Sequence, residues 1–599
     1  MKLSDYVVSF FERQKVTNIF MVSGGGCMHL VNSFGNSQKI KYWCTQHEQS
    51  AAMAAEGYAK LKNDLCVVLT TSGPGATNTI TGVLDCYQDS TPVIFISGQA
   101  KRKQTVYNSG LNGLRQFGVQ EANIIPIISS ITKYAVEINN PNKIRYYLEK
   151  AVHEAKTGRP GPVWLSIPLD VQSANVKEYE LEGYPEFRDS GLIEPSTEDV
   201  TYVHECLKKA KRPVIIAGHG VRLADACEML SDVVQKYKIP VVTPIMGIDV
   251  LYSKHECNIG RIGTKGTRAG NFAMQNADLL ISIGSRLSVS VVGYEYHLFA
   301  REAKVLVVDV DQTEHLKKTI QIDRIIYSDA KQFLKQFSAF ENNELDFHDW
   351  LKQCQNWKTK YPVILEDYNN DKNGINYYKF MGLLNEKMTA DMPVISDAGS
   401  SFYVVAQAVE LKKGQRHITT GGTATMGFAL PAAIGVCVAN AGHPVIAITG
   451  EGSFMQNLQE MEVLKYHHLN IKVFVMENGG YFSIRQTQKK FFDGHFVGEG
   501  EASGLSFTNM EKLADAFGVE YYSLEGIEQS RKQLDQILNS SGPAIIRVRI
   551  DPNMEIVPTN SSMMRTDGVM ISKPLEDLYP FLDRKEFYEN MIVPPVDEG

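Results

Sequence analysis

The stretch Gly450–Asn457, GEGSFMQN, directly follows the apolar run PVIAIT, and Val475–Gln486, VMENGGYFSIRQ, completes a second apolar run. Each run predicts a buried strand that ends in a glycine-rich turn, and parallel strands end at one edge of their sheet. We therefore expect Glu451 and Asn478 to lie together at the edge where such sheets bind ligands. Their oxygens suit Mg²⁺, and the glycines let backbone amides approach a diphosphate. Either turn alone is more often an ordinary strand end, so the prediction depends on the pair.

Composition sets the class of protein. A chain of 599 residues predicts roughly three to four domains. Hydrophobic residues make up 43% and charged residues 22%, and the net charge of −7 comes without a basic stripe, which argues against a nucleic-acid partner. The nine cysteines are scattered without a CxxC pair, which favours reduced thiols. No apolar run is long enough to span a bilayer, so we expect a cytoplasmic protein without a membrane partner.

Apolar runs bounded by Gly and Pro alternate with helical stretches along the chain. Runs such as CVVLTTSGPG, IPVVTPIMG and PVIAITGEGS predict parallel strands that are buried on both faces. The pattern predicts an α/β protein with three doubly wound parallel-sheet domains and a C-terminal arm. The expected limits are residues 1–174, 200–340 and 376–555 for the domains, 175–199 and 341–375 for polar linkers, and 556–599 for the arm.

The two turns together resemble the metal–diphosphate motif of thiamine diphosphate (ThDP) enzymes, usually written GDG…NN. The chain departs from this motif twice, because Glu451 stands where Asp is usual and Glu477 replaces the first Asn. The resemblance implies that Glu451 and Asn478 bind Mg²⁺ through their side chains and Gly480 through its carbonyl. It also implies that the first domain binds the cofactor's pyrimidine, the third its diphosphate, and that the central domain is Rossmann-like.

A segment of the first domain extends the resemblance over nearly the whole chain. TQHEQSAAMAAEGYAK, which contains Glu48, resembles the RHEQ…AAEGYAR segment of the acetolactate synthase group. In that family the glutamate hydrogen-bonds the cofactor's pyrimidine ring. A proton held at the ring nitrogen favours the imino tautomer, whose exocyclic nitrogen removes the thiazolium C2 proton, and the cofactor then performs the carbanion chemistry. The resemblance makes Glu48 the first catalytic candidate, although a helix carboxylate taken alone is more often simply exposed.

Further segments imply contacts with the cofactor. TTSGPGATN supplies Thr71, DAGSS supplies residues near the diphosphate, and GGTATMGFALPAAIG supplies a methionine that would wedge between the two cofactor rings. The Ala424 carbonyl would accept a hydrogen bond from the exocyclic amine. The full set implied for the cofactor is Glu48, Thr71, Gly399, Ser400, Ser401, Ala424, Met426, Gly452, Ser453 and Tyr481.

The first glycine turn indicates the type of reaction. Members of the superfamily that protonate the carbanion use an acidic residue in this turn and a pair of histidines, but the turn VSGGGCMH has Gly25 at the acidic position and the domain has no His-His pair. The segment QFGVQEANIIPIISSITK instead resembles the synthase segment AFQE…PITK, with Gln120 and Lys133 matching. Without a proton relay, capture of the carbanion by a second carbonyl is favoured. We therefore predict a carboligase with catalytic residues Glu48, Gln120 and Gly25.

The acceptor side departs from the synthases. Val119 stands where the family has Phe, and Thr487 stands where it has the Trp of QWQ; His29 is the third predicted residue of the substrate pocket. The family's GMHG segment is replaced by GRIGTKGTRAG. The resemblance implies a 2-keto acid donor such as pyruvate and leaves the carbonyl acceptor open. A large polar ketone, such as a keto-sugar nucleotide, fits as well as a second pyruvate.

The resemblance also implies an assembly, because the family's cofactor lies between the first domain of one subunit and the third of another. We expect a homodimer or homotetramer. Three alternatives stay open. The Rossmann-like centre and the weak AGHGV signal at Ala217–Val221 permit a pyruvate-oxidase-type flavoenzyme with FAD. A ThDP-dependent cyclic dione hydrolase belongs to the same superfamily, and a catalytically inactive scaffold would account for Glu451 and Glu477.

Overall fold

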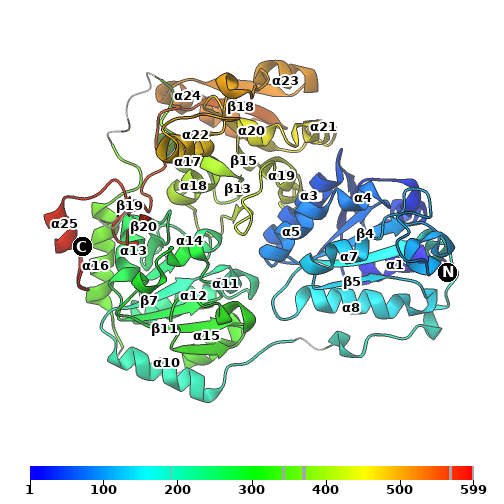
Figure 1. Cartoon of the computed structure of the whole chain (residues 1–599), viewed down its shortest axis with the longest axis horizontal. Helices are drawn as coiled ribbons and strands as arrows, with labels where there is room; N and C mark the ends of the chain where they lie inside the picture. The colour runs from blue at the N-terminus through cyan, green and yellow to red at the C-terminus, as the bar shows by residue number, and fades with distance from the viewer. Residues whose placement is uncertain (189–190, 340–344, 367, 369–372, 565–569, 597–599) are drawn as a thin grey trace.

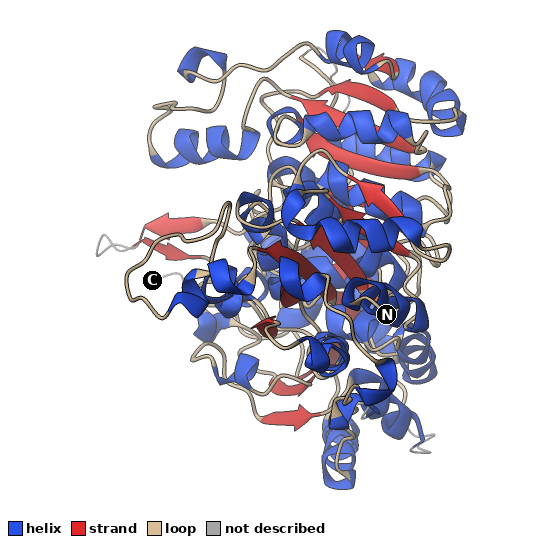
Figure 2. Ribbon diagram, turned by 90° about the vertical axis from the view of Figure 1, so that its right-hand side faces the viewer, coloured by secondary structure: helices blue, strands red, loops and turns tan. Residues whose placement is uncertain are grey.

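Three parallel six-stranded sheets build the molecule, which confirms the predicted α/β class (Figure 1). The computed structural model describes residues 1–188, 191–339, 345–366, 368, 373–564 and 570–596. The expected domain limit at Phe340 lies outside these residues, as do parts of both expected linkers and of the arm. In the view of Figure 2 helices lie on the faces of the sheets, and inner strands such as β3 (Cys66–Thr70), β10 (Leu279–Ile283) and β15 (Val445–Gly450) are almost entirely buried.

The N-terminal domain has the strand order β2-β1-β3-β4-β6-β5. Its inner strands are mostly apolar, and all five residues of β3 are buried, as the runs between Gly and Pro predict, whereas three of the four residues of the edge strand β2 are exposed. The strands are β1 Asn18–Met21, β2 Lys41–Cys44, β3 Cys66–Thr70, β4 Val93–Gln99, β5 Tyr134–Glu137 and β6 Val163–Pro168. The helices are α1 Leu3–Arg13, α2 Met28–Asn36, α3 Glu48–Lys62, α4 Pro74–Thr77, α5 Ile80–Gln88, α6 Val106–Ser109, α7 Ile124–Ile128, α8 Ile144–Lys156 and α9 Leu169–Gln172.

The central domain has the strand order β12-β11-β10-β7-β8-β9. If β7 is counted as the domain's first strand and the sheet is read from β9, this is 3-2-1-4-5-6, the doubly wound order of dinucleotide-binding domains. Its strands are β7 Pro213–Ala217, β8 Val241–Thr243, β9 Asn258–Arg261, β10 Leu279–Ile283, β11 Lys304–Asp309 and β12 Arg324–Tyr327. Its helices are α10 Thr197–Lys209, α11 His219–Leu223, α12 Cys227–Tyr237, α13 Arg268–Gln275, α14 Val289–Val292 and α15 Ala330–Ala339.

The C-terminal sheet, β14-β13-β15-β16-β18-β17, repeats the strand order of the N-terminal sheet. Its strands are β13 Val394–Ser396, β14 His417–Ile418, β15 Val445–Gly450, β16 Ile471–Glu477, β17 Glu520–Leu524 and β18 Ala544–Arg549. Its helices are α17 Tyr377–Lys387, α18 Gly399–Ala408, α19 Ala429–Ala439, α20 Glu451–Phe454, α21 Met461–Tyr466, α22 Phe482–Phe491, α23 Met510–Phe517 and α24 Ile527–Asn539.

The N- and C-terminal domains meet where α3 packs on α19. A Cβ atom on Gly57 would come within 2.4 Å of the Ala432 carbonyl oxygen, and one on Gly435 within 1.7 Å of the Ala54 carbonyl oxygen. Only glycine permits this backbone approach. The two predicted ligand-binding edges are therefore held in a fixed relation by a glycine-lined helix pair.

The stretch 341–375 and the arm both contribute to the core of the central domain. Helix α16, His348–Lys360, buries Trp350 and Trp357 there, and its first tryptophan donates to the Pro213 carbonyl at 3.1 Å. The arm contains β19 Ser562–Met564, β20 Met570–Ser572 and α25 Arg584–Glu589, and it returns to the central domain beside α16 (Figure 1). Among the described residues, no helix has the length and apolar character that crossing a bilayer requires.

Candidate active site

The predicted metal ligands lie at the carboxyl ends of the neighbouring strands β15 and β16. Glu451 follows β15 and is 2% exposed, and its Oε2 accepts a 2.7 Å hydrogen bond from the backbone N–H of Asn478, which follows β16. Burial raises the pKa of Glu451 to about 7. The structure therefore brings this pair together, as the two opening turns predict.

The pair has the donors that a divalent metal requires. The Asn478 Oδ1 atom is buried and has no hydrogen-bond partner within the described residues. An orphaned buried oxygen beside a buried carboxylate fits a hard cation such as Mg²⁺. The Gly480 carbonyl accepts from the Phe482 backbone at 3.1 Å and keeps a second lone pair. In the part of the chain that is described, no three His, Cys, Asp or Glu side chains cluster to hold a metal, so a metal bound here would also require amide and carbonyl oxygens.

The second departure from the motif, Glu477, has a structural partner. Arg547 on the adjacent strand β18 donates from Nε and Nη2 to the two carboxylate oxygens of Glu477, at 2.7 and 2.6 Å. A bidentate pair of this kind is geometrically specific. The Glu477 carboxylate is thereby paired with Arg547, next in the chain to the predicted metal ligand Asn478.

The residues expected near the diphosphate line the same edge. Gly399 begins α18 with φ of 67°, and the Ser401 hydroxyl accepts from Tyr377 at 3.2 Å. Ser400 is buried beside it. An N-terminal helix turn with small residues can receive a phosphate. In the turn that follows β15, a Cβ on Gly452 would lie 2.0 Å from the Tyr481 ring, so these two predicted residues are in contact.

Asp397 is a residue of this site that the sequence reasoning did not single out. Its Oδ2 accepts from the hydroxyls of Ser453 and Thr449, at 2.6 and 2.9 Å, and burial raises its pKa to about 7. The Ser453 hydroxyl in turn accepts from the Gly427 backbone N–H at 2.7 Å. Ser453 thus joins two loops of the site. The sequence signal that could have identified Asp397 is its position directly after β13 and at the start of the DAGSS segment.

The N-terminal half of the site surrounds Glu48, which begins α3. Its Oε2 accepts from Asn78 Nδ2 at 2.9 Å, and a Cβ on Gly75 would approach Oε1 to 3.2 Å. Thr71, just after β3, accepts from the Gly26 backbone N–H at 3.0 Å through its hydroxyl. The structure therefore gathers Glu48, Thr71 and the first glycine turn at one edge. Asn78 is a neighbour that sequence reasoning missed.

The remaining predicted residues of this domain vary in placement. The Gln120 backbone has φ of 57°, and its carbonyl would lie 2.5 Å from a Cβ on Gly73, so Gln120 joins the Glu48 group. Val119 beside it is 87% exposed. His29 lies half-buried on α2, and no atom is within 4 Å of a Cβ built on Gly25. Lys133 lies before β5, at the opposite edge of the sheet, and donates to the Thr157 carbonyl at 2.7 Å.

On the C-terminal side, Ala424 and Met426 lie in the segment Gly421–Gly427 between β14 and α19. Ala424 has φ of 50°, the left-handed region that non-glycine residues rarely adopt. Thr487 lies on the exposed face of α22, where its hydroxyl donates to the Ser483 carbonyl at 2.9 Å. The predicted residues thus form two groups, one on the N-terminal and one on the C-terminal domain.

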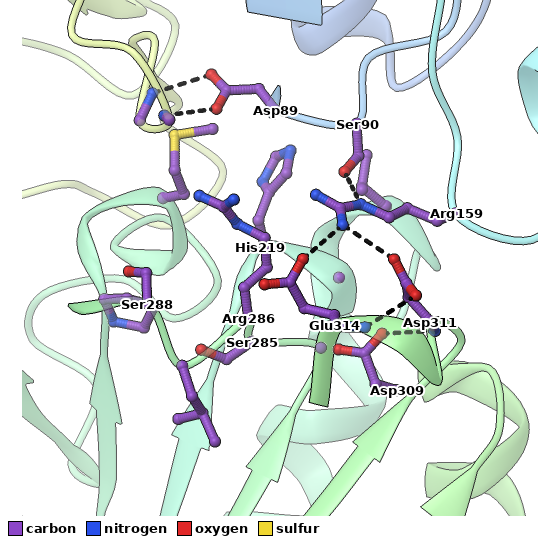
Figure 3. A pocket seen from close by; sticks show the side chains of 18 of the residues that line it. Asp89, Ser90, Arg159, His219, Ser285, Arg286, Ser288, Asp309, Asp311 and Glu314 are labelled. Atoms are coloured by element: carbon purple, nitrogen blue, oxygen red, sulfur yellow. Dashed lines mark hydrogen bonds and ion pairs between the residues drawn. The ribbon is translucent and has the colours of Figure 1, made fainter. Parts of the chain in front are cut away.

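A cavity of about 840 Å³ lies where all three domains meet (Figure 3). Arg159 of the N-terminal domain reaches across it to Asp311 and Glu314 of the central domain, at 3.0 and 2.9 Å. His219, from the AGHGV segment, lines it, and burial lowers the pKa of this imidazole to about 4. The segment Gly421–Ala424 forms part of the opposite wall.

Comparison with known families matches each domain in turn. The thiamine pyrophosphate enzyme N-terminal TPP binding domain matches residues 1–127, the central domain matches 200–337, and the C-terminal TPP binding domain matches 397–548. The chain belongs to the thiamine pyrophosphate enzymes. Thiamine pyrophosphate is ThDP, and the two matched binding domains carry the two groups of site residues. The protein is therefore a ThDP-dependent enzyme, as predicted.

Relatives of this ThDP enzyme share nearly its full length. The acetolactate synthase large subunit of Lactococcus lactis is 32% identical over 572 residues, covering 95% of this chain and 96% of the relative. Acetolactate synthase isozyme 2 large subunit of Escherichia coli is 30% identical, with 94% and 99% covered. The probable acetolactate synthase large subunit of Methanocaldococcus jannaschii is 32% identical, with 92% of each covered. The predicted resemblance to this group is confirmed.

Proposed function

We propose that this enzyme is a ThDP- and Mg²⁺-dependent carboligase that decarboxylates a 2-keto acid, pyruvate, and transfers the acetyl group to a carbonyl acceptor. The observation that carries the proposal is the N-terminal half-site, where Glu48 and a first glycine turn without an acidic side chain both adjoin the loop Thr71–Gly75. The relatives named acetolactate synthase support the same reaction class.

The residues of the chain have separate roles in this proposal. When bound, ThDP supplies the carbanion chemistry. Glu48 holds a proton at the pyrimidine ring, and Asn78 orients its carboxylate through the 2.9 Å hydrogen bond. Glu451, Asn478 and the Gly480 carbonyl hold Mg²⁺, for which the orphaned Asn478 oxygen is the direct support. Met426 and Ala424 support the cofactor's bent shape.

Carbon–carbon bond formation is proposed in place of simple protonation because the first glycine turn has no acidic side chain. Gly25 offers no side chain where related decarboxylases have an acid, and open space surrounds its Cβ position. The neighbouring Gln120 supplies an amide, which does not donate a proton at neutral pH. With no acidic side chain in this turn to supply a proton, the residues of the half-site would favour a second carbonyl compound as the partner for the chemistry that bound ThDP supplies.

The acceptor is proposed to be larger and more polar than pyruvate, with a keto-sugar nucleotide as the chemical type. Val119 and Thr487 stand where synthases have Phe and Trp, so neither carries an aromatic ring, and both side chains are exposed in the single chain, where a substrate could reach them. A second pyruvate, as in the relatives' acetolactate synthesis, is the alternative acceptor.

We further propose a homodimer, or a tetramer built from it, with each site between the N-terminal domain of one subunit and the C-terminal domain of another. Support comes from exposed large apolar side chains beside both half-sites, which a partner would cover. These are Met28, Tyr107, Leu111, Phe117 and Val119 on one side and Ile484, Phe491, Phe492, Phe496 and Val497 on the other. The scattered free cysteines support action in the cytoplasm.

Two other reactions have distinct signatures. A flavoenzyme would hold FAD in the central cavity, and the purified protein would be yellow. Arg159, which pairs with Asp311 and Glu314 at that cavity, would then have to accommodate the flavin nucleotide. A dione hydrolase would cleave a cyclic diketone without a 2-keto acid donor.

Product analysis tests the proposal. Pyruvate is incubated with the enzyme, ThDP, Mg²⁺ and a panel of ketone acceptors that includes keto-sugar nucleotides, and the products are identified by mass spectrometry. An acetylated acceptor supports the carboligase. Acetaldehyde alone, or cleavage of a cyclic dione without pyruvate, would contradict it, and calorimetric titration with ThDP and Mg²⁺ checks cofactor binding independently.

A further inference from the structure

The segment Gly421–Gly427, which carries Ala424 and Met426, has a conformation that it cannot hold by itself. Ala424 has φ of 50° and Gly427 has φ of 78°, and no helix or strand includes these residues. A non-glycine residue in the left-handed region is strained and persists where its surroundings fix it. Within the C-terminal domain, Thr420 accepts from the Ala424 and Thr425 N–H groups at 2.7 and 2.9 Å, and Ser453 accepts from the Gly427 N–H; the glycines at the start of the segment and the threonine hydroxyls have partners elsewhere.

Two carboxylates of the N-terminal domain are those partners. Oδ1 of Asp85, on α5, accepts from the hydroxyls of Thr423 and Thr425, both at 2.7 Å. These threonines flank Ala424, the strained residue. The Asp85 side chain is fully buried, so water does not compete for these bonds.

Asp89 binds the start of the same segment. It directly follows α5, one turn after Asp85, so the two side chains share a face of the helix. Its Oδ2 and Oδ1 accept from the backbone N–H groups of Gly421 and Gly422, at 2.9 and 2.8 Å, the pair of bonds drawn from Asp89 in Figure 3. One helix face therefore binds four residues of the segment, Gly421, Gly422, Thr423 and Thr425.

A buried lysine completes the arrangement. Lys60 on α3 donates to Asp89 at 2.8 Å and to the Thr419 carbonyl at 2.7 Å, and it pairs with Glu56 at 2.6 Å. Burying a charged group costs on the order of several kcal/mol unless its partners compensate. Apolar side chains would join the domains at lower cost but would not fix individual N–H and hydroxyl groups. The cluster thus specifies the shape of the segment.

We propose that Asp85 and Asp89 are positioning residues that hold Gly421–Gly427 in the conformation that presents the Ala424 carbonyl and the Met426 side chain to ThDP. This inference rests on the proposed role of the segment as the cofactor's support. Neither aspartate touches the cofactor in this proposal. Each acts through the threonines or glycines that it binds.

The test compares three changes at this contact in the full-length protein. Asp85→Ala removes the acceptor, Thr423→Val with Thr425→Val removes both donors, and Asp85→Asn keeps an oxygen acceptor. ThDP affinity is measured by calorimetry at saturating Mg²⁺, and thermal unfolding of the cofactor-free protein is measured beside it. Thr132→Val is the matched control, because it removes a buried threonine bond to the Ile128 carbonyl, 2.9 Å long, at the far edge of the sheet.

We expect Asp85→Ala and the double threonine variant each to weaken ThDP binding at least tenfold, which is about 1.4 kcal/mol. Combining them should add little, because both remove the same two bonds. Asp85→Asn should stay within threefold of the wild type, and Thr132→Val should not change the affinity.

Unchanged ThDP affinity in the double threonine variant, with a wild type that binds, would overturn the inference even if Asp85→Ala fails to fold. So would a lowered unfolding temperature in the Asp85 variant without any loss of affinity, because that result describes only a domain contact. A wild type that does not bind ThDP would instead overturn the proposed function.

Discussion

The backbone N–H of Asn478 donates a 2.7 Å hydrogen bond to the Glu451 carboxylate, and this bond joins the ends of β15 and β16. The extra methylene of Glu451, relative to the usual Asp, is accommodated because the carboxylate reaches across to the neighbouring strand end. The Asn478 side-chain oxygen stays buried and unpartnered within the described structure, which leaves it available to a cation.

Asn478→Ala is therefore expected to weaken ThDP retention chiefly through lost Mg²⁺. The alanine removes the proposed metal ligand without removing the backbone bond to Glu451, so excess Mg²⁺ should partly restore ThDP binding. ThDP affinity measured over a range of Mg²⁺ concentrations checks this, with the exposed Asn539→Ala as control. A Mg²⁺ ion found on other side chains would remove Glu451 and Asn478 from this role.

Glu48→Gln should preserve the fold and ThDP binding but lose most turnover. The amide still accepts from Asn78, but it cannot hold the proton at the pyrimidine ring, and such proton transfer contributes about 10²- to 10⁴-fold. Steady-state turnover and calorimetric ThDP affinity are measured together. Glu205→Gln, on an exposed face of α10, is the control. Near-normal turnover with normal affinity would exclude Glu48 as the catalytic carboxylate.

Asp249→Asn should destabilise the contact between the central and C-terminal domains. Asp249 is buried between Arg416, 2.5 Å away, and Arg222, 3.5 Å away, and the removal of one partner from a buried pair costs about 3–5 kcal/mol. Thermal unfolding at neutral pH measures the loss. Asp225→Asn, in the exposed pair with Lys331, should have almost no effect.

The same aspartate predicts a pH dependence. Burial is the largest single influence on Asp249 and by itself would raise its pKa. The two neighbouring arginines together outweigh burial and lower the pKa of Asp249 to about 2, against about 3.9 in the unfolded chain. Because the folded pKa is depressed, the stabilisation is complete above about pH 4 and is lost as the pH falls through about 2. The difference in unfolding temperature between wild type and Asp249→Asn should shrink over that interval. A constant difference down to pH 2 would contradict this assignment.

The parts of this structure that sequence could predict are those with a local signal. β15 and β16 are mostly apolar and buried, and each leads into a glycine-containing turn, so their positions and the meeting of Glu451 with Asn478 followed from pattern alone. Helix α16 has a signal that polar composition masks: Trp350, Cys354 and Trp357 recur at helical spacing within the stretch expected to be a linker.

Other contacts have no local signal at all. Asp85 and Thr423 are 338 positions apart, and Glu477 and Arg547 are 70 apart. Whether the two residues of such a pair meet depends on which helices or strands pack against each other and on the direction of their side chains in the packed structure. A sequence motif identifies such a residue only when it matches a family pattern, and Asp85 was outside the motifs considered.

Thr487→Trp tests the acceptor. The tryptophan ring of the synthase segment would refill the volume that Thr487 leaves, and contacts of this kind are worth about 1–3 kcal/mol, or about 10- to 200-fold in discrimination. We expect the variant to impair ligation to a large polar acceptor while it spares consumption of the donor. Donor consumption with an artificial electron acceptor is assayed beside the complete ligation.

The matched control for this change is Thr359→Trp. Thr359 is also an exposed helical threonine whose hydroxyl donates to the carbonyl four residues before it, at 3.0 Å, so loss of that bond and of threonine's helix preference is common to both variants. Only the change on α22 should separate the two half-reactions, because only α22 lies beside the metal and diphosphate turns. If both rates fall equally in Thr487→Trp, or if ligation to the native acceptor is normal, Thr487 does not line the acceptor pocket. The large polar acceptor would then lose its strongest support, and a second pyruvate would be the better assignment.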